Sequence, residues 1–384
     1  MIARSRKATV LAGICTLSLI AAACGDDSSG SSDTTAAATA TTAAGAATTA
    51  ASTATTAKSD EKLSAKLGAS GATFPKAFYE EVIDAFTADN PGVSIDYAGG
   101  GSGKGRQDLA DQLVDWAGTD GVIKAEDKAK FKGGDVLYFP TVVAPITVSF
   151  NVAGVDELSL SPDTIAGIFS GTITKWDDAA IAADNADVEL PSTNIAVVHR
   201  SDSSGTTENF TKFLDAASGA TGSGVWKLGK GSTVEWPANT QGAEGNAGVA
   251  SLIKTTDGAI GYVDLSDAKA SGLKFASVKN KAGKFVEPTL EAASAAAAGA
   301  KINADLTFFA GWAEGDAAYP IAAQTWIIVY KNQTDKAKGE AVKAFVEFML
   351  TDGQDMAEDI DYAPLPADLD KQALAQLDAI VIPA

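Results

Sequence analysis

The feature that most constrains the fold of this chain is a repeated local pattern: a short apolar strand, a polar or glycine-rich turn, then a helix. Residues 93–97 and 195–198 read as strands, and each is followed by such a turn. Residues 325–330 read as a buried strand, and residues 336–350 beyond it read as a helix. Strands that alternate with helices predict an α/β fold, and about 320 residues are enough for two domains.

Apolar spacing places two further helices after these strands. Leu109 and Leu113 recur at helical spacing beyond the first glycine-rich turn and are expected on one buried face. Phe210, Phe213 and Leu214 do the same beyond residues 195–198. No repeat of fixed period is found.

The N-terminus has the composition of an export signal. Arg4, Arg6 and Lys7 precede an uncharged apolar run over residues 8–23, and Cys24 follows. The run is shorter than the roughly 20 residues that a membrane-spanning helix needs. Residues 19–24 resemble a bacterial lipoprotein signal, so we expect residues 1–23 to be removed and Cys24 to carry the lipid, palmitate among its acyl chains. The alternative is an ordinary secretory signal with an incidental cysteine.

Residues 24–63 are almost entirely small or polar. Ala, Thr, Ser, Gly and Asp dominate, and such a segment has too little apolar bulk to offset the entropy of ordering. We expect a disordered tether on the lipid anchor, with a root-mean-square reach of roughly 35 Å. A plain low-complexity tail is the alternative.

Cysteine and histidine usage limits the chemistry of the folded region. Cys15 lies in the signal and Cys24 is the proposed lipid site, so no cysteine is left for a disulfide or a thiolate metal site. His199 is the single histidine. A catalytic triad would have to use it, and the neighbouring charge of Arg200 should disfavour a protonated imidazole. We therefore interpret His199 as a structural strand residue and expect no metal, no cofactor and no catalysis.

The net charge excludes one class of partner. The precursor carries −19, and removal of residues 1–23 leaves 27 basic against 49 acidic residues, or −22. Nucleic-acid binding depends on neutralising phosphates with basic residues, so nucleic acid is not expected as a partner.

Four polar turns could hold an anion. The first, residues 71–75, places Thr73 and Phe74 just before a helix, with Pro75 suited to the first helical position. The N–H groups there would lie near the positive end of the helix. The second, residues 99–105, is glycine-rich around Ser102, which lets backbone N–H groups approach an oxyanion. It matches neither the nucleotide P-loop nor the dinucleotide fingerprint.

The other two turns contribute charged residues. Residues 116–120 read as a turn after a helix and end in Asp120. Residues 200–207 follow the strand 195–198 and supply Arg200, several hydroxyls and the N–H groups that open a helix. This combination suits a tetrahedral oxyanion. For any one of these residues a plain polar helix cap is the alternative.

With these residues in place, the chain resembles the phosphate-binding proteins of phosphate-specific ABC importers. The motifs that carry the resemblance occur in the family's order: residues 71–75, 101–103, 118–120, 175–178, 191–207, 258–263 and 361–366. The departure is His199, where the family has Arg, and it lies just outside the ligand set.

The resemblance implies a site, residue by residue. The expected phosphate ligands are Thr73, Phe74, Ser102, Asp120, Arg200, Ser204, Gly205 and Thr206. Asp202 is expected to pair with the ligand arginine, and Ser203 lies beside these residues.

The resemblance also implies the architecture and the partners. The expected fold is a two-lobed, type II-like periplasmic-binding-protein clamshell with the ligand in the interlobe cleft. Lobe 1 would combine residues 64–142 with 321–384, and lobe 2 would cover 143–320. The chain would be a monomer, anchored by its lipid to the outer face of the cytoplasmic membrane. It would deliver phosphate to the permease and ATPase of an ABC importer.

Asp120 indicates which oxyanion such a site would select. Phosphate at neutral pH keeps a proton that it can donate to a carboxylate, whereas sulfate would face Asp120 with two acceptors in contact. A receptor for sulfate or molybdate is the alternative within the same class. An exported phosphatase would need an activated nucleophile or clustered metal ligands. A stalked surface adhesin would leave the cleft residues idle.

Overall fold

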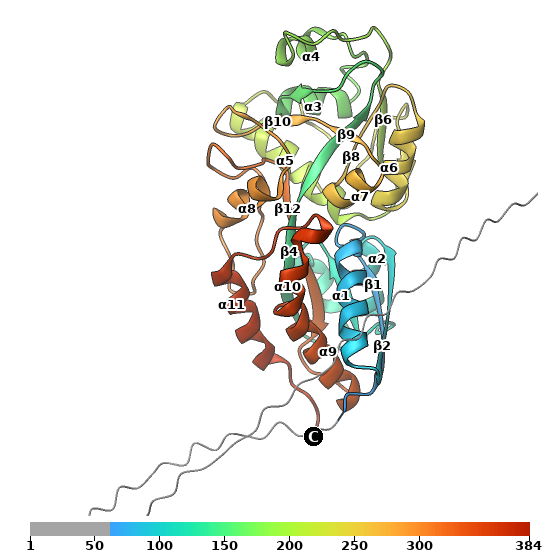
Figure 1. The fold of residues 1–384 in the computed structure, drawn as a ribbon, viewed down its shortest axis with the longest axis vertical. Helices are drawn as coiled ribbons and strands as arrows, with labels where there is room; N and C mark the ends of the chain where they lie inside the picture. The colour runs from blue at the N-terminus through green and yellow to red at the C-terminus, as the bar shows by residue number, and fades with distance from the viewer. Residues whose placement is uncertain (1–61) are drawn as a thin grey trace, which may run out of the picture. The chain divides into compact units, whose positions relative to one another are not determined.

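The computed structural model describes residues 62–384, and the predicted signal, Cys24 and nearly all of the tether lie outside them. These residues form an α/β fold, as predicted (Figure 1). The strands are β1 Ala65–Gly71, β2 Val93–Gly100, β3 Trp116–Thr119, β4 Val136–Asn151, β5 Ser159–Leu160, β6 Ala196–Arg200, β7 Gln241–Ala243, β8 Ala259–Asp264, β9 Lys274–Phe275, β10 Ser277–Lys279, β11 Phe285–Val286 and β12 Ala322–Tyr330. Within residues 62–384, no helix is long and apolar enough to cross a membrane.

Helices separate most of these strands along the chain. They are α1 Lys76–Asp89, α2 Ser102–Ala110, α3 Pro162–Phe169, α4 Ala179–Asp184, α5 Gly205–Thr221, α6 Gly245–Thr255, α7 Leu265–Ala270, α8 Leu290–Ala298, α9 Lys336–Met349, α10 Asp352–Met356 and α11 Ala367–Gln376. Three short 3-10 helices add Ala125–Lys130, Glu358–Ile360 and Leu377–Ala379.

The long strand β4 belongs to both halves of one continuous sheet. The strand order is β2-β1-β3-β12-β4-β8-β6-β7, with β9 paired to β4 as well. Residues 136–145 of β4 pair antiparallel with β12, and residues 146–151 pair antiparallel with β8. We call the β2-β1-β3-β12 side the β1 half and the β8-β6-β7 side the β8 half. Figure 1 shows β4 passing from one half to the other.

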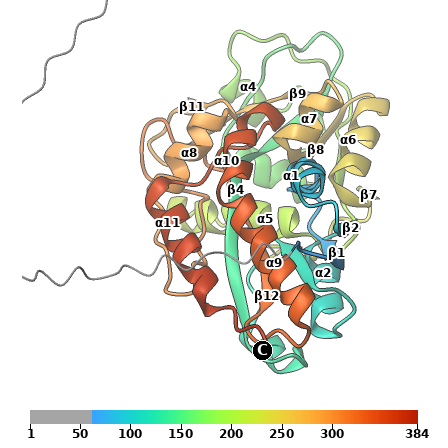
Figure 2. The same cartoon turned by 60° about the horizontal axis from the view of Figure 1, so that its bottom comes forward.

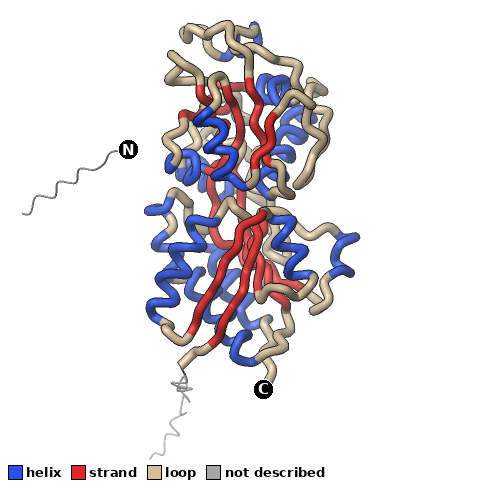
Figure 3. Tube along the Cα trace, turned by 90° about the vertical axis from the view of Figure 1, so that its right-hand side faces the viewer, coloured by secondary structure: helices blue, strands red, loops and turns tan. Residues whose placement is uncertain are grey.

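Each half is packed around buried aromatic side chains. In the β1 half, Trp116 stacks on Tyr97 at 5.1 Å, and Phe345 of α9 meets Phe86 of α1 at 5.3 Å between ring centroids. Figure 2 shows the same helices from a second direction, and Figure 3 shows helices on both sides of the strands in this half. In the β8 half, Phe210 of α5 stacks on Tyr262 of β8 at 4.4 Å.

The structure bears out most of the strands and helices expected from apolar spacing, with two corrections. Residues 116–119 are not a turn: they form the buried strand β3, which pairs with β1 and β12. Leu113 is not on a buried helix face: α2 ends at Ala110, and the Leu113 side chain is 72% exposed. Pro75 is not the first helical residue: it directly precedes α1, which begins at Lys76.

Candidate functional site

The starts of four helices and the end of β3 meet where the two halves touch. α1 and α2 come from the β1 half, and α5 and α6 come from the β8 half. The N–H of Gly103 in α2 donates to the carbonyl oxygen of Ser203 across the junction at 2.9 Å. A Cβ atom added to Gly205 would lie closer than 3.0 Å to side-chain atoms of Ser102 and Asp120. The two halves are therefore in direct contact at this point.

Gly101 makes this close approach of the two halves possible. Its φ of +89° lies in the left-handed region that favours glycine. A side chain there would also collide with the Asp202 carboxylate and the Ser203 carbonyl of the other half. The glycine-rich sequence of the turn thus serves both backbone conformation and packing between the halves.

Several backbone N–H groups at this junction are not used by the protein's own hydrogen bonds. Those of Phe74, Ser102, Gly205 and Thr206 have no acceptor within residues 62–384. The first N–H groups of a helix have no intrahelical partner, and the helix dipole places partial positive charge on them. Since these groups come from the starts of α2 and α5 and from the residue before the α1 cap, they form a surface suited to a negative charge.

Hydroxyl groups surround the same point. Ser204 caps α5, and its Oγ accepts from the N–H of Thr207 at 3.1 Å. Ser102 Oγ accepts from the N–H of Asp120 at 3.1 Å and donates to Asp120 Oδ2 at 3.2 Å. Ser102, Ser204 and Thr206 are at most 1% exposed, so their hydroxyls act in a dehydrated environment.

Arg200 brings a buried guanidinium into this group of residues. It is 3% exposed and lies at the end of β6. Its Nε donates to Asp202 Oδ1 at 2.7 Å, and a second guanidinium nitrogen donates to Asp202 Oδ2. Its third nitrogen donates to Thr206 Oγ1 at 3.3 Å. Because an arginine is always charged and only donates, this buried fork adds fixed positive charge to the site.

Asp120 is the acceptor among these donors. It directly follows β3 and is 1% exposed, and its Oδ1 has no hydrogen-bond partner within the described chain. Burial raises the pKa of Asp120 to about 7, although nearby Thr325, Arg200 and Ser102 act in the opposite direction. The Oδ1 atom is therefore a buried acceptor without a donor in the described chain, although N–H groups, hydroxyls and the Arg200 guanidinium lie nearby.

This buried carboxyl group should make the stability of the anion-free protein depend on pH. As pH rises from about 4 to about 7, Asp120 ionises in the unfolded chain but stays protonated in the folded one, so the free energy of unfolding falls. We expect Asp120→Asn to remove this loss, so that the variant gains on the order of 1–4 kcal/mol over the wild type across that window. Urea unfolding of both anion-free proteins at several pH values measures it. A difference that is constant with pH would contradict the expectation.

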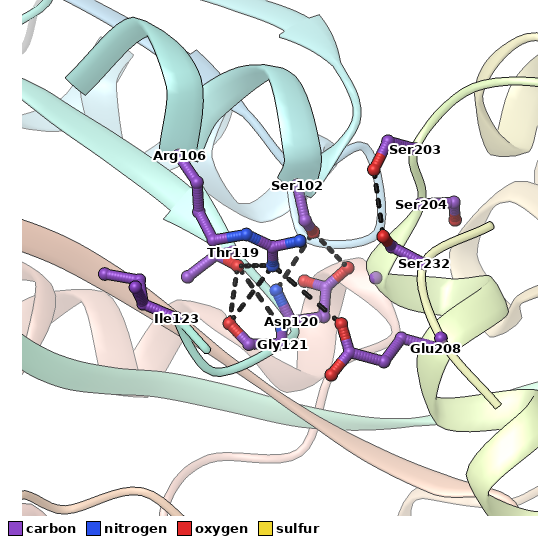
Figure 4. A network of polar contacts seen from close by, with 12 residues as sticks. Ser102, Arg106, Thr119, Asp120, Gly121, Ile123, Ser203, Ser204, Glu208 and Ser232 are labelled. Atoms are coloured by element: carbon purple, nitrogen blue, oxygen red, sulfur yellow. Dashed lines mark hydrogen bonds and ion pairs between the residues drawn. The ribbon is translucent and has the colours of Figure 1, made fainter. Parts of the chain in front are cut away.

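The structure brings the sequence-predicted site residues to one place. Thr73 and Phe74 lie before α1, Ser102 opens α2, and Asp120 follows β3. The others lie at the end of β6 and the start of α5, namely Arg200, Asp202, Ser203, Ser204, Gly205 and Thr206. Ser203 differs from its neighbours, because its Oγ turns to Ser232 at 3.0 Å (Figure 4). The third predicted turn, residues 116–120, is wrong in its structure, because Asp120 follows the strand β3 directly.

His199 lies in β6, outside this group. Its ring stacks on Trp236 at 5.0 Å, and its Nδ1 lies 2.9 Å from the carbonyl oxygen of Arg200. Burial lowers the pKa of His199, while the contact with that carbonyl raises it. The expectation of a disfavoured imidazolium holds, but its cause is burial and not the charge of Arg200.

Sequence reasoning missed two residues at the junction. Asn246, the second residue of α6, is fully buried between Thr73, Arg200 and Thr206. Arg106 of α2 donates to Thr119 Oγ1 at 2.8 Å and lies 3.9 Å from the Glu208 carboxylate of α5, so it spans the two halves (Figure 4). The signal available for Asn246 was a Gly-Asn pair opening a helix after a short strand, the same arrangement as the other turns.

Sequence comparisons with known proteins agree with an anion site at this junction. A model of the PBP superfamily domain matches residues 28–353. The phosphate-binding protein PstS of Methanocaldococcus jannaschii is 37% identical over 338 residues, which cover 81% of this chain and 85% of that protein. PstS 2 of Mycobacterium tuberculosis is 35% identical over 329 residues, covering 82% and 87%.

Solved structures agree with this. A subatomic-resolution structure of a high-affinity periplasmic phosphate-binding protein with bound phosphate superposes with a TM-score of 0.67 at 25% identity, covering 81% of this chain and 94% of that one. The phosphate-binding protein of Stenotrophomonas maltophilia has the same fold, with a TM-score of 0.65 at 22% identity over 82% and 94% of the two chains.

A sheet shared by two halves, with polar helix starts meeting at their junction, is the fold of the periplasmic binding proteins. The relatives that this chain matches are phosphate-binding proteins. Within that superfamily, this chain belongs to the family of the phosphate-binding proteins.

Proposed function

We propose that this protein binds inorganic phosphate at the junction of its two halves. One observation carries the proposal: a buried set of unused N–H groups, hydroxyls and one guanidinium surrounds a single carboxylate with a free acceptor, Asp120 Oδ1. A dehydrated phosphate needs donors at most of its oxygens, or the desolvation cost is not recovered. Its remaining proton needs an acceptor. The site offers both.

The residues that we assign to phosphate are those that converge at the junction. They are Thr73, Phe74, Ser102, Asp120, Arg200, Ser204, Gly205 and Thr206. Asp202 would hold the Arg200 guanidinium in place through its two-point contact, and Ser203 would support the junction through its carbonyl oxygen. The carboxylate of Asp120 would accept the proton of the bound phosphate.

The proposed mechanism is capture by closure. Lobe 1, residues 64–142 and 321–384, and lobe 2, residues 143–320, would rotate about the strands that connect them, as hinge-bending receptors do. Phe74, Ser102 and Asp120 lie in one lobe, and Arg200 with the start of α5 lies in the other. Since the ligand set is complete only when the lobes meet, phosphate would stabilise the closed state by its differential affinity for it.

Around this core we propose an exported receptor. Residues 1–23 would direct export, Cys24 would be lipidated at the outer face of the cytoplasmic membrane, and residues 24–63 would act as the tether. The monomeric receptor would pass phosphate to the permease and ATPase of an ABC importer. The basic start, the apolar run and the Ala/Thr-rich segment support this.

Calorimetric titration tests the proposed function. The chain from residue 25 onward, freed of endogenous ligand, should bind phosphate with a dissociation constant of about 1 μM or tighter. At about pH 9, where Asp120 is ionised, sulfate should bind at least about 100-fold more weakly, because it cannot donate a proton to the carboxylate. Incubation with a chromogenic phosphate ester should release no phosphate. Failure to bind either anion would contradict the proposal. Tight sulfate binding would instead favour the alternative, a receptor for another oxyanion.

A further inference from the structure

Asn246 makes more contacts with the proposed phosphate ligands than its place in the sequence suggests. It is fully buried at the start of α6, after Gly245, whose φ is +69°. Its side-chain nitrogen lies 3.4 Å from Thr73 Oγ1 and 3.2 Å from Thr206 Oγ1. Its side-chain oxygen lies 3.2 Å from a guanidinium nitrogen of Arg200. One amide thus touches three of the eight residues assigned to the anion.

The orientation of this amide follows from Arg200. A guanidinium only donates, so the amide atom that faces it must be the acceptor, Oδ1. The Nδ2 group then faces the two threonine hydroxyls, and its two hydrogens are directed at Thr73 and Thr206. Arginine therefore fixes the polarity of the amide, and the amide in turn acts on both hydroxyls.

The two hydroxyls have their acceptor positions occupied. Thr206 Oγ1 accepts from Arg200 at 3.3 Å and from Asn246 Nδ2 at 3.2 Å. Thr73 Oγ1 accepts from the backbone N–H of Asn246 at 3.2 Å and from its Nδ2 at 3.4 Å. A hydroxyl has two acceptor lone pairs and one hydrogen. With both lone pairs used, each hydroxyl can only donate to a further partner.

We propose that Asn246 is a positioning residue that sets the proton pattern of the bound anion by holding the hydroxyls of Thr73 and Thr206 as donors. This inference rests on the proposed function. It identifies Asn246 as the residue that determines which oxygens of the bound phosphate can carry a proton. The Thr73 and Thr206 hydroxyls then donate to unprotonated oxygens of the anion, and only Asp120 is left to accept a proton from it. Without Asn246, each hydroxyl regains a free lone pair and can rotate, so the site no longer enforces that pattern.

A double-mutant cycle on the chain from residue 25 onward tests this inference. We expect Asn246→Ala to weaken phosphate binding about 10- to 100-fold, the cost of leaving buried polar groups unsatisfied. Thr73→Ala should weaken it by a similar factor. If Asn246 acts through the Thr73 hydroxyl, the double variant should bind little more weakly than the weaker single variant. Calorimetry gives all four dissociation constants.

Two results would overturn the inference. One is phosphate binding by Asn246→Ala within about twofold of the wild type, and the other is losses that simply multiply in the double variant, which a purely structural role of Asn246 predicts. Asn280→Ala is the matched control, because Asn280 is also buried but bonds to the carbonyl oxygens of residues 315, 316 and 318. It should lower stability and leave phosphate affinity unchanged. Absence of phosphate binding in the wild type itself would instead overturn the proposed function.

Discussion

Replacing Arg200 with methionine should reduce phosphate affinity by at least about 1,000-fold, because a charge-assisted donor is lost inside a dehydrated site. The side-chain volume is largely kept, but Asp202 loses the partner that occupies both of its oxygens. An unpaired buried carboxylate beside an anion adds repulsion to the lost attraction. Breaking a buried pair from one side costs about 3–5 kcal/mol, so the anion-free variant should also unfold at lower urea concentration.

A second substitution separates these two effects. Arg200→Met combined with Asp202→Asn removes the orphaned charge, and the neutral amide can still accept from the N–H of Gly245, which now donates to Asp202 at 3.1 Å. We expect the double variant to recover most of the lost stability and almost none of the phosphate affinity. Calorimetry and urea unfolding measure the two quantities. Phosphate binding by Arg200→Met within about tenfold of the wild type would contradict the assignment of Arg200.

The main helices and strands of the fold could be predicted because the apolar residues that they bury recur at regular intervals in the sequence. Phe210, Phe213 and Leu214 recur at helical intervals and are all buried in α5. The strand β3 could not be predicted in this way, since its sequence Trp-Ala-Gly-Thr has the composition of a turn. Its extended conformation comes from pairing with β1 and β12, which lie far away in the sequence.

Leu113 shows the opposite limit of local spacing. It continues an apolar pattern, but α2 stops at Ala110 and the chain turns through Gln112, which has a φ of +60°. Spacing alone does not show where a helix ends. The leucine is left on the surface.

The site residues also fall into two groups: those that local sequence identifies and those that only the folded chain brings together. Turn chemistry and the family resemblance identify the residues near helix starts, because their role depends on local backbone. Asn246 could not be identified in this way. Its role comes from Thr73, 173 positions earlier in the chain, and from Arg200 and Thr206, 46 and 40 positions earlier. A Gly-Asn pair alone reads as a turn, and only the folded chain places it against two hydroxyls and a guanidinium.

Asp120→Asn should convert a phosphate-selective site into one that accepts sulfate. Asparagine keeps the shape of the side chain but offers an amide donor to a sulfate oxygen and a carbonyl acceptor to a phosphate proton. We expect sulfate affinity to rise by at least about 100-fold, and phosphate affinity to fall by no more than about tenfold. Calorimetric titration of both anions near pH 9 measures the change, because Asp120, with its pKa raised to about 7, is ionised there. Continued exclusion of sulfate by the variant would contradict the role assigned to the carboxylate.

The pH dependence of sulfate binding tests the same carboxylate in the unaltered protein. Burial raises the pKa of Asp120 to about 7, so the group gains a proton as pH falls through that value and can then donate to sulfate. Wild-type sulfate affinity should therefore increase as pH falls, whereas Asp120→Asn should show no such trend. Asp264→Asn is the matched control, because burial also raises the pKa of Asp264, which caps α7. If Asp264→Asn also admitted sulfate, the selectivity could not be assigned to Asp120.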